Sequence, residues 1–187
     1  MHVTDGAIGM VTAEPLAAET AEPRLGDLFE AHYRRLFRLA RRLVSSTDEA
    51  RDLVQDTFLR AARSPRSVPV GMPGEEAWLV RVLVNLCRDR WRKRDVQRRF
   101  QERHTASALD RTTPGTESAL IAQTLIWNAL RELPPRRRAV IVLHELDGER
   151  VADIARLLGI AAVTVRWHLS MGRRDLGKIL KTREERT

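Results

Sequence analysis

One stretch near the end of the chain, VADIARLLGIAAVTVRWHLS at residues 151–170, carries side chains suited to a nucleic-acid groove. Residues 151–158 have the apolar spacing of a short helix, and Gly159 can adopt the left-handed backbone that ends one. Ala155 lies four residues before that glycine, where a small side chain lets the next helix cross closely. Val165 lies six residues after it and seals the contact. This spacing predicts a helix-turn-helix.

The second helix of this motif would turn polar and basic side chains outward if Val165 and Leu169 face the core. Arg166 could then contact guanine edges or phosphates, while hydroxyl groups donate to phosphates. A helical hairpin that binds nothing has the same spacing. A tryptophan on its outer face, however, is expected to be covered by a binding partner or by another part of the protein. The outward residues are Thr164, Arg166, Trp167, Ser170, Met171 and Arg174.

A second polar face lies on a long helix predicted from Glu75 onward. Asn85 and Asp89 lie one turn apart, with Arg88 and Arg92 beside them. An asparagine amide can donate a hydrogen bond to a base edge and accept one from it. The alternative is that the Asn85 amide makes its hydrogen bonds within the protein and has only a structural role. A basic track continues from this face toward residue 103, and it contains Arg88, Arg90, Arg92, Lys93, Arg94, Arg98, Arg99 and Arg103.

The composition favours a polyanionic partner. Lysine and arginine total 33 against 25 acidic residues, which gives a net charge of +8. An anionic membrane is the rival interpretation, and the codon bias of a GC-rich genome would explain the arginine content without any function. Cys87 is the single cysteine, so an internal disulfide and a multi-cysteine metal site are excluded. We expect it to be a small core residue.

The apolar periodicity predicts helices and no sheet, so the expected fold is all-α with two small helical domains joined by a flexible linker. Helices are expected over residues 28–44, 46–64, 75–98, 117–132 and 134–146, followed by the helix-turn-helix. The proline-rich run SPRSVPVGMPG at 64–74 predicts a loop. The predicted divisions are a disordered acidic tail at 1–24, a first domain at 25–98, the linker at 99–116 and a second domain at 117–187.

No signal peptide or membrane span is predicted, so the chain is expected to be cytoplasmic, without direct membrane insertion. Asp52 with Asp56, or His144 with Glu145, could be drawn as acid–base pairs. Surface carboxylates on helices are common, however, and no phosphate loop or metal-ligand group accompanies them. We therefore assign no catalytic residue, no metal site, no cofactor and no small-molecule substrate.

In its two helical domains the chain resembles the extracytoplasmic-function (ECF) sigma factors of bacterial RNA polymerase. The likeness covers residues 25–98 and 117–180. LFEAHYRRLFRLARRLV and DEARDLVQDTFLRAAR look like the first two helices of sigma domain 2, and AWLVRVLVNLCRDRWRKR is similar to its promoter-melting helix. The run from Leu130 to Leu176 is similar to sigma domain 4. The larger family members' first and third domains have no counterpart in this sequence.

The resemblance implies binding to core RNA polymerase and to promoter DNA. Its clamp-helix contacts on the largest subunit would be Asp52, Gln55 and Asp56, flanked by Leu53 and Phe58, and domain 4 would meet the flap of the second-largest subunit. Minus-ten recognition and melting without ATP would use Asn85, Arg88, Asp89, Arg92 and Lys93, together with the 64–74 loop, to capture a flipped base. Minus-thirty-five contacts would be Thr164, Arg166, Trp167, Ser170, Met171, Arg173 and Arg174. The resemblance also implies an anti-sigma factor as a partner.

Some positions depart from the family pattern. His144 stands where arginine is frequent, and Ala161, Ala162 and Val163 precede the recognition helix. Trp167 and Met171 occupy positions that are usually small, polar or basic. Affinity for the upstream element is therefore expected to depend on phosphate contacts from the arginines of that helix.

Two functions fit these observations. The first is a sigma factor that joins core polymerase and directs promoter-specific initiation. The alternative is a stand-alone helix-turn-helix repressor or activator, which leaves the DLVQDTF run and the melting helix without a role. Promoter-specific transcription with core polymerase distinguishes the two.

Overall fold

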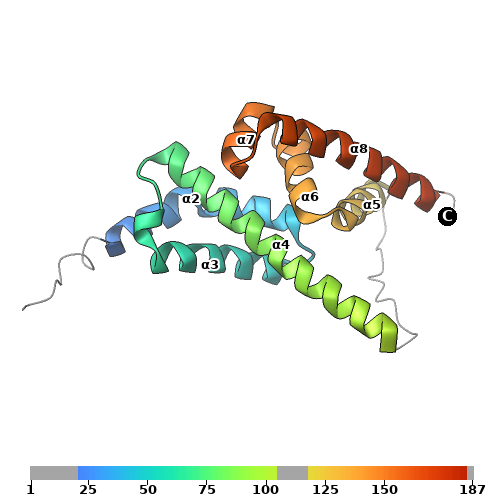
Figure 1. The fold of residues 1–187 in the computed structure, drawn as a ribbon, viewed down its shortest axis with the longest axis horizontal. Coiled ribbons are helices and arrows are strands. Elements are labelled where there is room, and N and C mark those ends of the chain that lie inside the picture. The colour runs from blue at the N-terminus through green and yellow to red at the C-terminus, as the bar shows by residue number, and fades with distance from the viewer. Residues whose placement is uncertain (1–20, 105–117, 185–187) are drawn as a thin grey trace, which may run out of the picture.

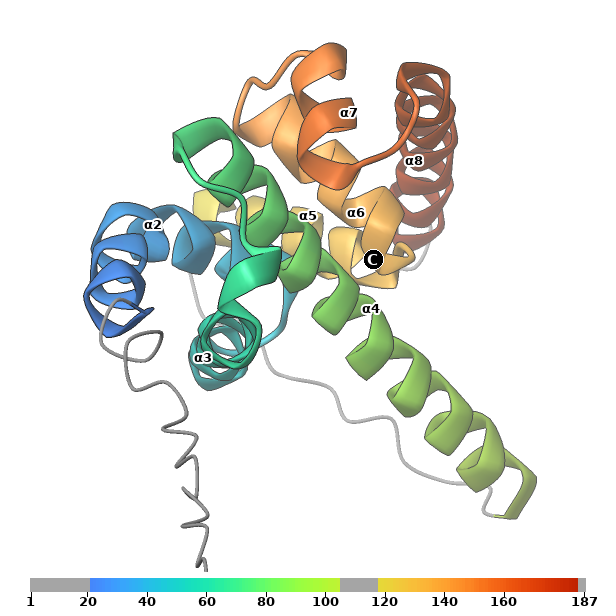
Figure 2. The ribbon, with the colours of Figure 1, turned by 60° about the vertical axis from the view of Figure 1, so that its left-hand side comes forward.

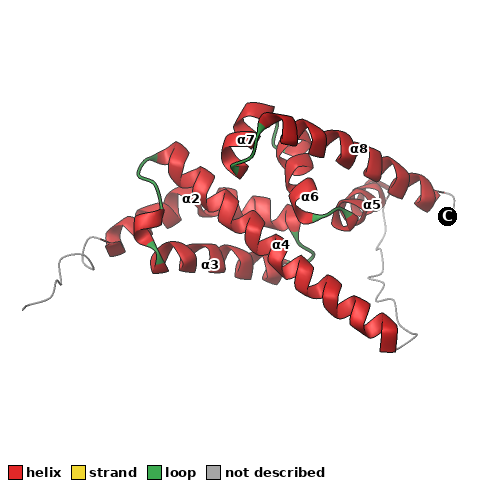
Figure 3. Ribbon diagram, in the orientation of Figure 1, coloured by secondary structure: helices red, strands yellow, loops and turns green. Residues whose placement is uncertain are grey.

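The computed structural model describes residues 21–104 and 118–184, and every regular element among them is a helix (Figure 3). This confirms the all-α fold expected from the periodicity. In chain order the elements are α2 (Ala21–Leu43), α3 (Thr47–Arg63), a 3₁₀ turn (Pro65–Ser67), α4 (Met72–His104), α5 (Ser118–Glu132), α6 (Pro135–Ile141), a π turn (Val142–Leu146), α7 (Val151–Leu158) and α8 (Ala162–Glu184).

The first helical unit consists of α2, α3 and α4, with α3 packed against both of the others. Its core is aliphatic, and Leu36, Leu53, Leu79 and Leu83 are almost completely buried. Ser46 caps α3 as the sequence predicts, because its hydroxyl accepts a hydrogen bond from the Glu49 amide at 3.0 Å. The C-terminal part of α4 extends away from the other helices (Figures 1 and 2).

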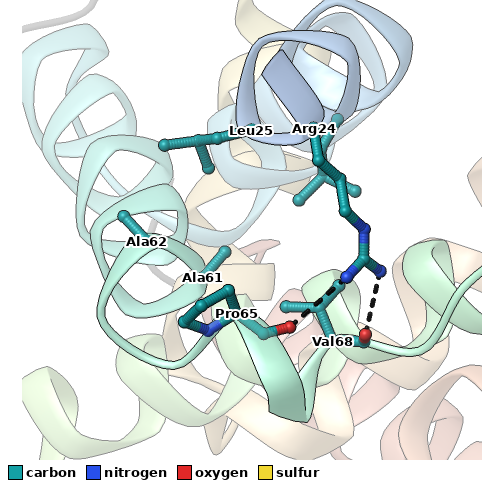
Figure 4. Close-up of a pocket in the computed structure, with 7 residues that line it drawn as sticks. Arg24, Leu25, Ala61, Ala62, Pro65 and Val68 are labelled. Carbon is teal, nitrogen blue, oxygen red and sulfur yellow. Dashed lines mark hydrogen bonds between the residues drawn. The ribbon is translucent and has the colours of Figure 1, made fainter. Parts of the chain in front are cut away.

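The first turn of α2 corrects one predicted boundary. The acidic tail was expected to run to residue 24, but α2 begins at Ala21. The Arg24 guanidinium donates to the backbone carbonyls of Pro65 and Val68 at 3.5 and 3.0 Å (Figure 4). These bonds attach the start of α2 to the loop between α3 and α4, over an apolar pocket of about 260 Å³.

The end of α4 corrects a second boundary. The linker was expected from residue 99, yet the helix continues to His104. Local helix propensity and the spacing of charged residues carry it on without an apolar stripe. Residues 105–117, which make up most of the expected linker, lie outside the described residues.

The second helical unit consists of α5 to α8, and α8 packs against α5, α6 and α7. Pro135 occupies the first turn of α6, where its missing amide hydrogen costs nothing. Gly159 follows α7 in the left-handed conformation, with φ of 63°, and turns the chain into α8. Gly172 marks the closest approach of two helices, because a Cβ there would lie 2.7 Å from an Ile141 side-chain carbon.

The two units are packed against each other, with α4 of the first lying along α6 and α7 of the second (Figures 1 and 2). We call this contact the seam. Arg35 pairs with Glu149 at 2.7 Å, and Arg42 pairs with Asp147. Arg81 of α4 approaches the turn of the helix-turn-helix, since its guanidinium carbon would lie 3.0 Å from a Cβ at Gly159.

One arginine at the seam is buried. Arg138, on α6, is only 5% exposed, and it donates to the Leu43 carbonyl at the end of α2. It also donates to the carbonyls of Arg131 and Leu133 at the end of α5. Burial lowers the pKa of this guanidinium, but arginine stays charged in proteins. A cation at two helix C-termini is favourable because both ends carry partial negative charge.

Within residues 21–104 and 118–184, no helix combines the length and the apolar character that crossing a membrane would require.

Candidate functional site

The polar face of α3 is available to a partner. Asp52 and Gln55 are exposed, and among the described residues neither side chain makes a hydrogen bond or an ion pair. Asp56 is half-buried and pairs with Arg90 of α4 at 2.5 Å. Two of the three predicted polar residues are therefore free to bind, while the third also joins α3 to the predicted melting helix.

Leu53 and Phe58 have a different place from the one expected. Leu53 is fully buried and Phe58 is 7% exposed, because both lie on the apolar stripe that faces α2 and α4. Leu53 offers almost no surface to a partner, whereas the edge of Phe58 lines the groove between α2 and α3. Their part in the site is to fix the rotation of α3, so that its polar face points outward.

An aromatic surface beside α3 was missed by the sequence reasoning. Phe29 is 44% exposed, and its ring lies 4.8 Å from that of Tyr33 and 4.9 Å from that of Phe58. Exposed Leu59 and Gln55 border the same apolar groove between α2 and α3. The i, i+4, i+8 spacing of Phe29, Tyr33 and Phe37 indicates an aromatic row on one face of α2, but the same spacing is typical of a buried stripe.

The predicted minus-ten residues lie on α4. Asn85, Arg88 and Asp89 are half-buried, and Arg92 and Lys93 are exposed. Arg88 contacts Asp89 at 3.4 Å. Asp89, Arg92 and Lys93 line a polar groove of about 630 Å³ between α3 and α4, whereas Asn85 and Arg88 are not among its lining residues. The structure thus places the five on one broad face of a single helix, because residues 85, 88, 89, 92 and 93 follow the three-and-four spacing of one helical side.

The helix-turn-helix has the arrangement that its spacing predicts. Val165 and Leu169 are buried at 0% and 5% exposure and hold α8 against the core. The predicted outward residues divide by exposure: Thr164 and Met171 are half-buried, and Arg166, Trp167, Ser170, Arg173 and Arg174 are exposed. A nucleic-acid groove therefore has access to the first turns of α8.

Arg173 and His144 share one edge of this surface. Both line a groove of about 490 Å³ with Arg166 and Ser170. Glu145 accepts two hydrogen bonds from the Arg173 guanidinium, at 2.9 and 2.7 Å. This pair is exposed, so its partner can be exchanged for a phosphate at little cost. His144, a departure from the family pattern, lines the same groove as these basic and hydroxyl side chains.

Trp167 lies at the opposite edge and is 52% exposed. The guanidinium of Arg137 lies 5.5 Å from the centre of the indole, within cation–π range. The His168 ring meets the indole edge-on, with centroids 4.9 Å apart. Arg137 is itself held by an ion pair with Asp175. The tryptophan is therefore exposed and at the same time fixed in orientation.

His168 makes the stability of this region depend on pH. Burial lowers the pKa of its imidazole, and the nearby Arg137 and Arg136 lower it further. The unfolded chain, with a histidine pKa of about 6.5, takes up the proton first as pH falls. We expect the free energy of unfolding to decrease from about pH 7 toward pH 5, and to do so less steeply in His168→Gln. Urea unfolding of both proteins at several pH values measures this, and equal slopes would contradict it.

Among the described residues, no group of three or more histidine, cysteine or carboxylate side chains could hold a metal ion. Cys87 is buried, and burial raises the pKa of its thiol, so it behaves as the core residue expected from the sequence. The surfaces described above offer binding groups: an acidic and amide face on α3, a polar face on α4 and a basic face on α8.

Comparison with known proteins finds one family match in each of the two helical units. Residues 28–97 match the family described as Sigma-70 region 2, and residues 123–176 match Sigma-70, region 4. The chain is 35% identical over 170 residues to the ECF RNA polymerase sigma factor SigM of Mycobacterium tuberculosis, covering 90% of this chain and 84% of that protein.

Two solved structures are also similar. The sigma factor RpoE of Bartonella quintana, in complex with the anti-sigma factor NepR, has 27% identity and a TM-score of 0.56, over 87% of this chain and 98% of that one. CnrH, in complex with the cytosolic domain of CnrY, has 25% identity and a TM-score of 0.58, over 89% of this chain and 96% of that one.

Proposed function

This chain belongs to the ECF sigma factors of RNA polymerase, and from that membership we propose how its own residues join core polymerase and direct initiation at a promoter. The first unit, α2 to α4, binds the clamp helices of the largest subunit. Asp52 and Gln55 make the direct contacts. Asp56 adds a contact to the clamp helices and keeps its ion pair with Arg90 of α4. The observation that carries this proposal is the exposed polar face of α3, where Asp52 and Gln55 make no hydrogen bond or ion pair with any described residue.

The minus-ten element meets α4. Asn85 supplies an amide for a base edge, and Arg88, Arg92 and Lys93 supply positive charge for the displaced strand. Asp89 orients Arg88 through their 3.4 Å contact. Energy from single-strand capture replaces ATP in opening the duplex. The projecting part of α4 lets a strand follow the helix beyond the body of the protein.

The minus-thirty-five element meets α8, while the same unit contacts the flap of the second-largest subunit. Arg166, Arg173 and Arg174 provide phosphate contacts, and Ser170 and Thr164 add hydroxyl donors. Trp167 and Met171 complete the surface that enters the groove. We keep the proposed domains at 25–98 and 117–187, and note that α2 begins at Ala21 and α4 ends at His104.

An anti-sigma factor is a further proposed partner. RpoE and CnrH, the similar proteins of known structure, are each seen bound to another protein, named as an anti-sigma factor in the case of RpoE. The apolar groove around Phe29 and Leu59 offers such a partner a surface on the first unit. We place the activity in the cytoplasm, where the polymerase works, and assign no catalytic reaction to the chain.

Run-off transcription tests the function. Purified chain and core polymerase, mixed with a library of promoters randomised in both elements, should yield transcripts from a restricted set of sequences. Core polymerase alone is the control and should yield no such selection. Specific binding to duplex DNA by the chain alone, with no selected transcript in the mixture, would support a stand-alone repressor or activator instead.

The role of Asn85 predicts a difference between two templates. Asn85→Ala should slow opening of a duplex promoter by about tenfold, because one base-edge contact of about 1.4 kcal/mol is lost from the melted state. On a template with a preformed bubble the loss should be much smaller, since opening is already complete. Run-off transcription from both templates measures this. An equal loss on both would assign Asn85 a structural role.

A further inference from the structure

The exposed side of α8 has two chemically different halves. Arg166, Ser170 and Arg173 form a polar half along the groove that also contains His144. Val163, Trp167 and Met171 form an apolar half, and they recur every fourth residue, so they lie on one face of the helix. Val163 is 64% exposed and Trp167 52% exposed, which are high values for large apolar side chains.

The indole at the centre of this apolar half is held in place before any partner arrives. Arg137 covers part of the ring at 5.5 Å, and the His168 ring contacts its edge. Arg137 is fixed in turn by its ion pair with Asp175. An aromatic ring that is already held in one orientation loses little conformational entropy on binding, so more of the free energy from burying its apolar surface contributes to affinity.

The charges around the apolar half favour a negatively charged occupant over a neutral or basic protein surface. Arg136, Arg137, Arg166 and Arg174 lie on or beside this part of α8. Glu145 and Asp175 pair with Arg173 and Arg137 and cancel one positive charge each, so Arg136, Arg166 and Arg174 leave a net positive charge beside the apolar half. An occupant must therefore be negatively charged overall and present an apolar group to the indole.

A DNA major groove meets both conditions, because the C5-methyl group of thymine is the apolar group on its base edges. We propose that Trp167, together with Val163, recognises thymine methyl groups in the upstream promoter element, and that the polar half of α8 takes the phosphates and guanine edges. This inference rests on the proposed docking of α8 on that element. It makes Trp167 a residue that determines sequence preference and not only affinity.

The test removes the methyl group and nothing else. Holoenzyme assembled from the full chain and core polymerase first selects its preferred upstream element from a randomised library. Each selected thymine is then replaced by deoxyuridine, which keeps the Watson–Crick edge and the charge. We expect one or two positions at which this replacement weakens promoter binding by about fourfold, the value of one buried methyl group.

Matched variants assign the effect to the indole. In Trp167→Ser the deoxyuridine replacement should make no difference at those positions, and in Trp167→Phe it should make a smaller difference than in the parent. Lys178→Ala, which changes an exposed residue three turns further along α8, should keep the full difference even where overall affinity falls. The parent and all three variants are compared on the same pair of templates.

Three results would overturn the proposal. Selection of an upstream element without thymine would do so, as would an unchanged affinity for deoxyuridine templates, which would leave the apolar half to a protein partner. An equal deoxyuridine effect in the parent and in Trp167→Ser would do the same. In all three cases promoter-specific transcription persists, so the sigma function stands. Absence of any promoter-specific transcript would instead reject the proposed function, and this inference with it.

Discussion

Replacing Asp52 and Gln55 together by alanine should weaken binding to core polymerase by about 30-fold to 100-fold, or about 2 to 2.8 kcal/mol. Both side chains are exposed on α3, and among the described residues neither has a partner that the substitutions would disrupt. The free energy of unfolding should therefore change by less than about 0.5 kcal/mol. Fluorescence titration of labelled chain with core polymerase, alongside urea unfolding, measures the two quantities.

The matched control for this double variant is Asp27→Ala, which removes an exposed carboxylate from the neighbouring helix α2. It should leave the affinity for core polymerase within about twofold of the parent, because a general loss of negative charge is not the cause. Asp56→Ala is less informative, since it also breaks the pair with Arg90. Unchanged assembly of the double variant with core would reject α3 as the clamp contact.

Arg138→Met should lower the free energy of unfolding by about 2 to 4 kcal/mol, the largest expected effect on stability. The side chains are similar in length, but methionine cannot donate to the carbonyls of Leu43, Arg131 and Leu133. The Arg131 and Leu133 carbonyls would lose this charged donor at the end of α5, and the Leu43 carbonyl would keep only the weak Cys87 thiol contact at 3.9 Å. Urea unfolding followed by circular dichroism measures the loss.

The control for Arg138→Met is Arg136→Met, two residues earlier on the same helix. Arg136 is half-buried, and no hydrogen bond or ion pair holds its side chain in the described part of the chain. Its replacement should change the free energy of unfolding by no more than about 0.5 kcal/mol. If the two variants lose the same stability, the buried carbonyl contacts do not contribute as the structure indicates.

Local signals in the sequence predicted most of the helices. Ser46 with Glu49 marks the start of α3, Pro135 marks the start of α6, and Gly159 marks the turn before α8, because each acts on backbone within a few residues of itself. The outward face of α8 followed from assigning Val165 and Leu169 to the core. Such features need no knowledge of which helix packs against which.

Contacts between distant segments could not be predicted in the same way. The burial of Arg138 depends on where the end of α2 lies, 95 residues earlier in the chain. In the sequence Arg138 is one of three consecutive arginines, and nothing in that run distinguishes the buried one. Arg24 was likewise placed in a tail because its acceptors, Pro65 and Val68, come more than 40 residues later.

The aromatic surface beside α3 also could not be predicted from the sequence. An apolar stripe indicates which side chains avoid water, but it does not tell which of them another helix covers. Phe29 and Phe58 belong to neighbouring stripes, yet Phe29 is 44% exposed and Phe58 only 7% exposed. The difference is set by the crossing of α2 and α3.

The seam between the two units limits what the chain can span. In the proposed function the two units contact elements named for positions ten and thirty-five, which are about 25 base pairs apart, or about 85 Å along the duplex at about 3.4 Å per pair. A compact chain of this length has a radius of gyration of about 16 Å, so a body closed as in Figure 2 cannot touch both elements at once. Bridging them requires the Arg35–Glu149 and Arg42–Asp147 pairs and the Arg138 contact with Leu43 to separate. The affinity for a complete promoter is therefore the combined affinity of two parted units, reduced by the free energy of parting them.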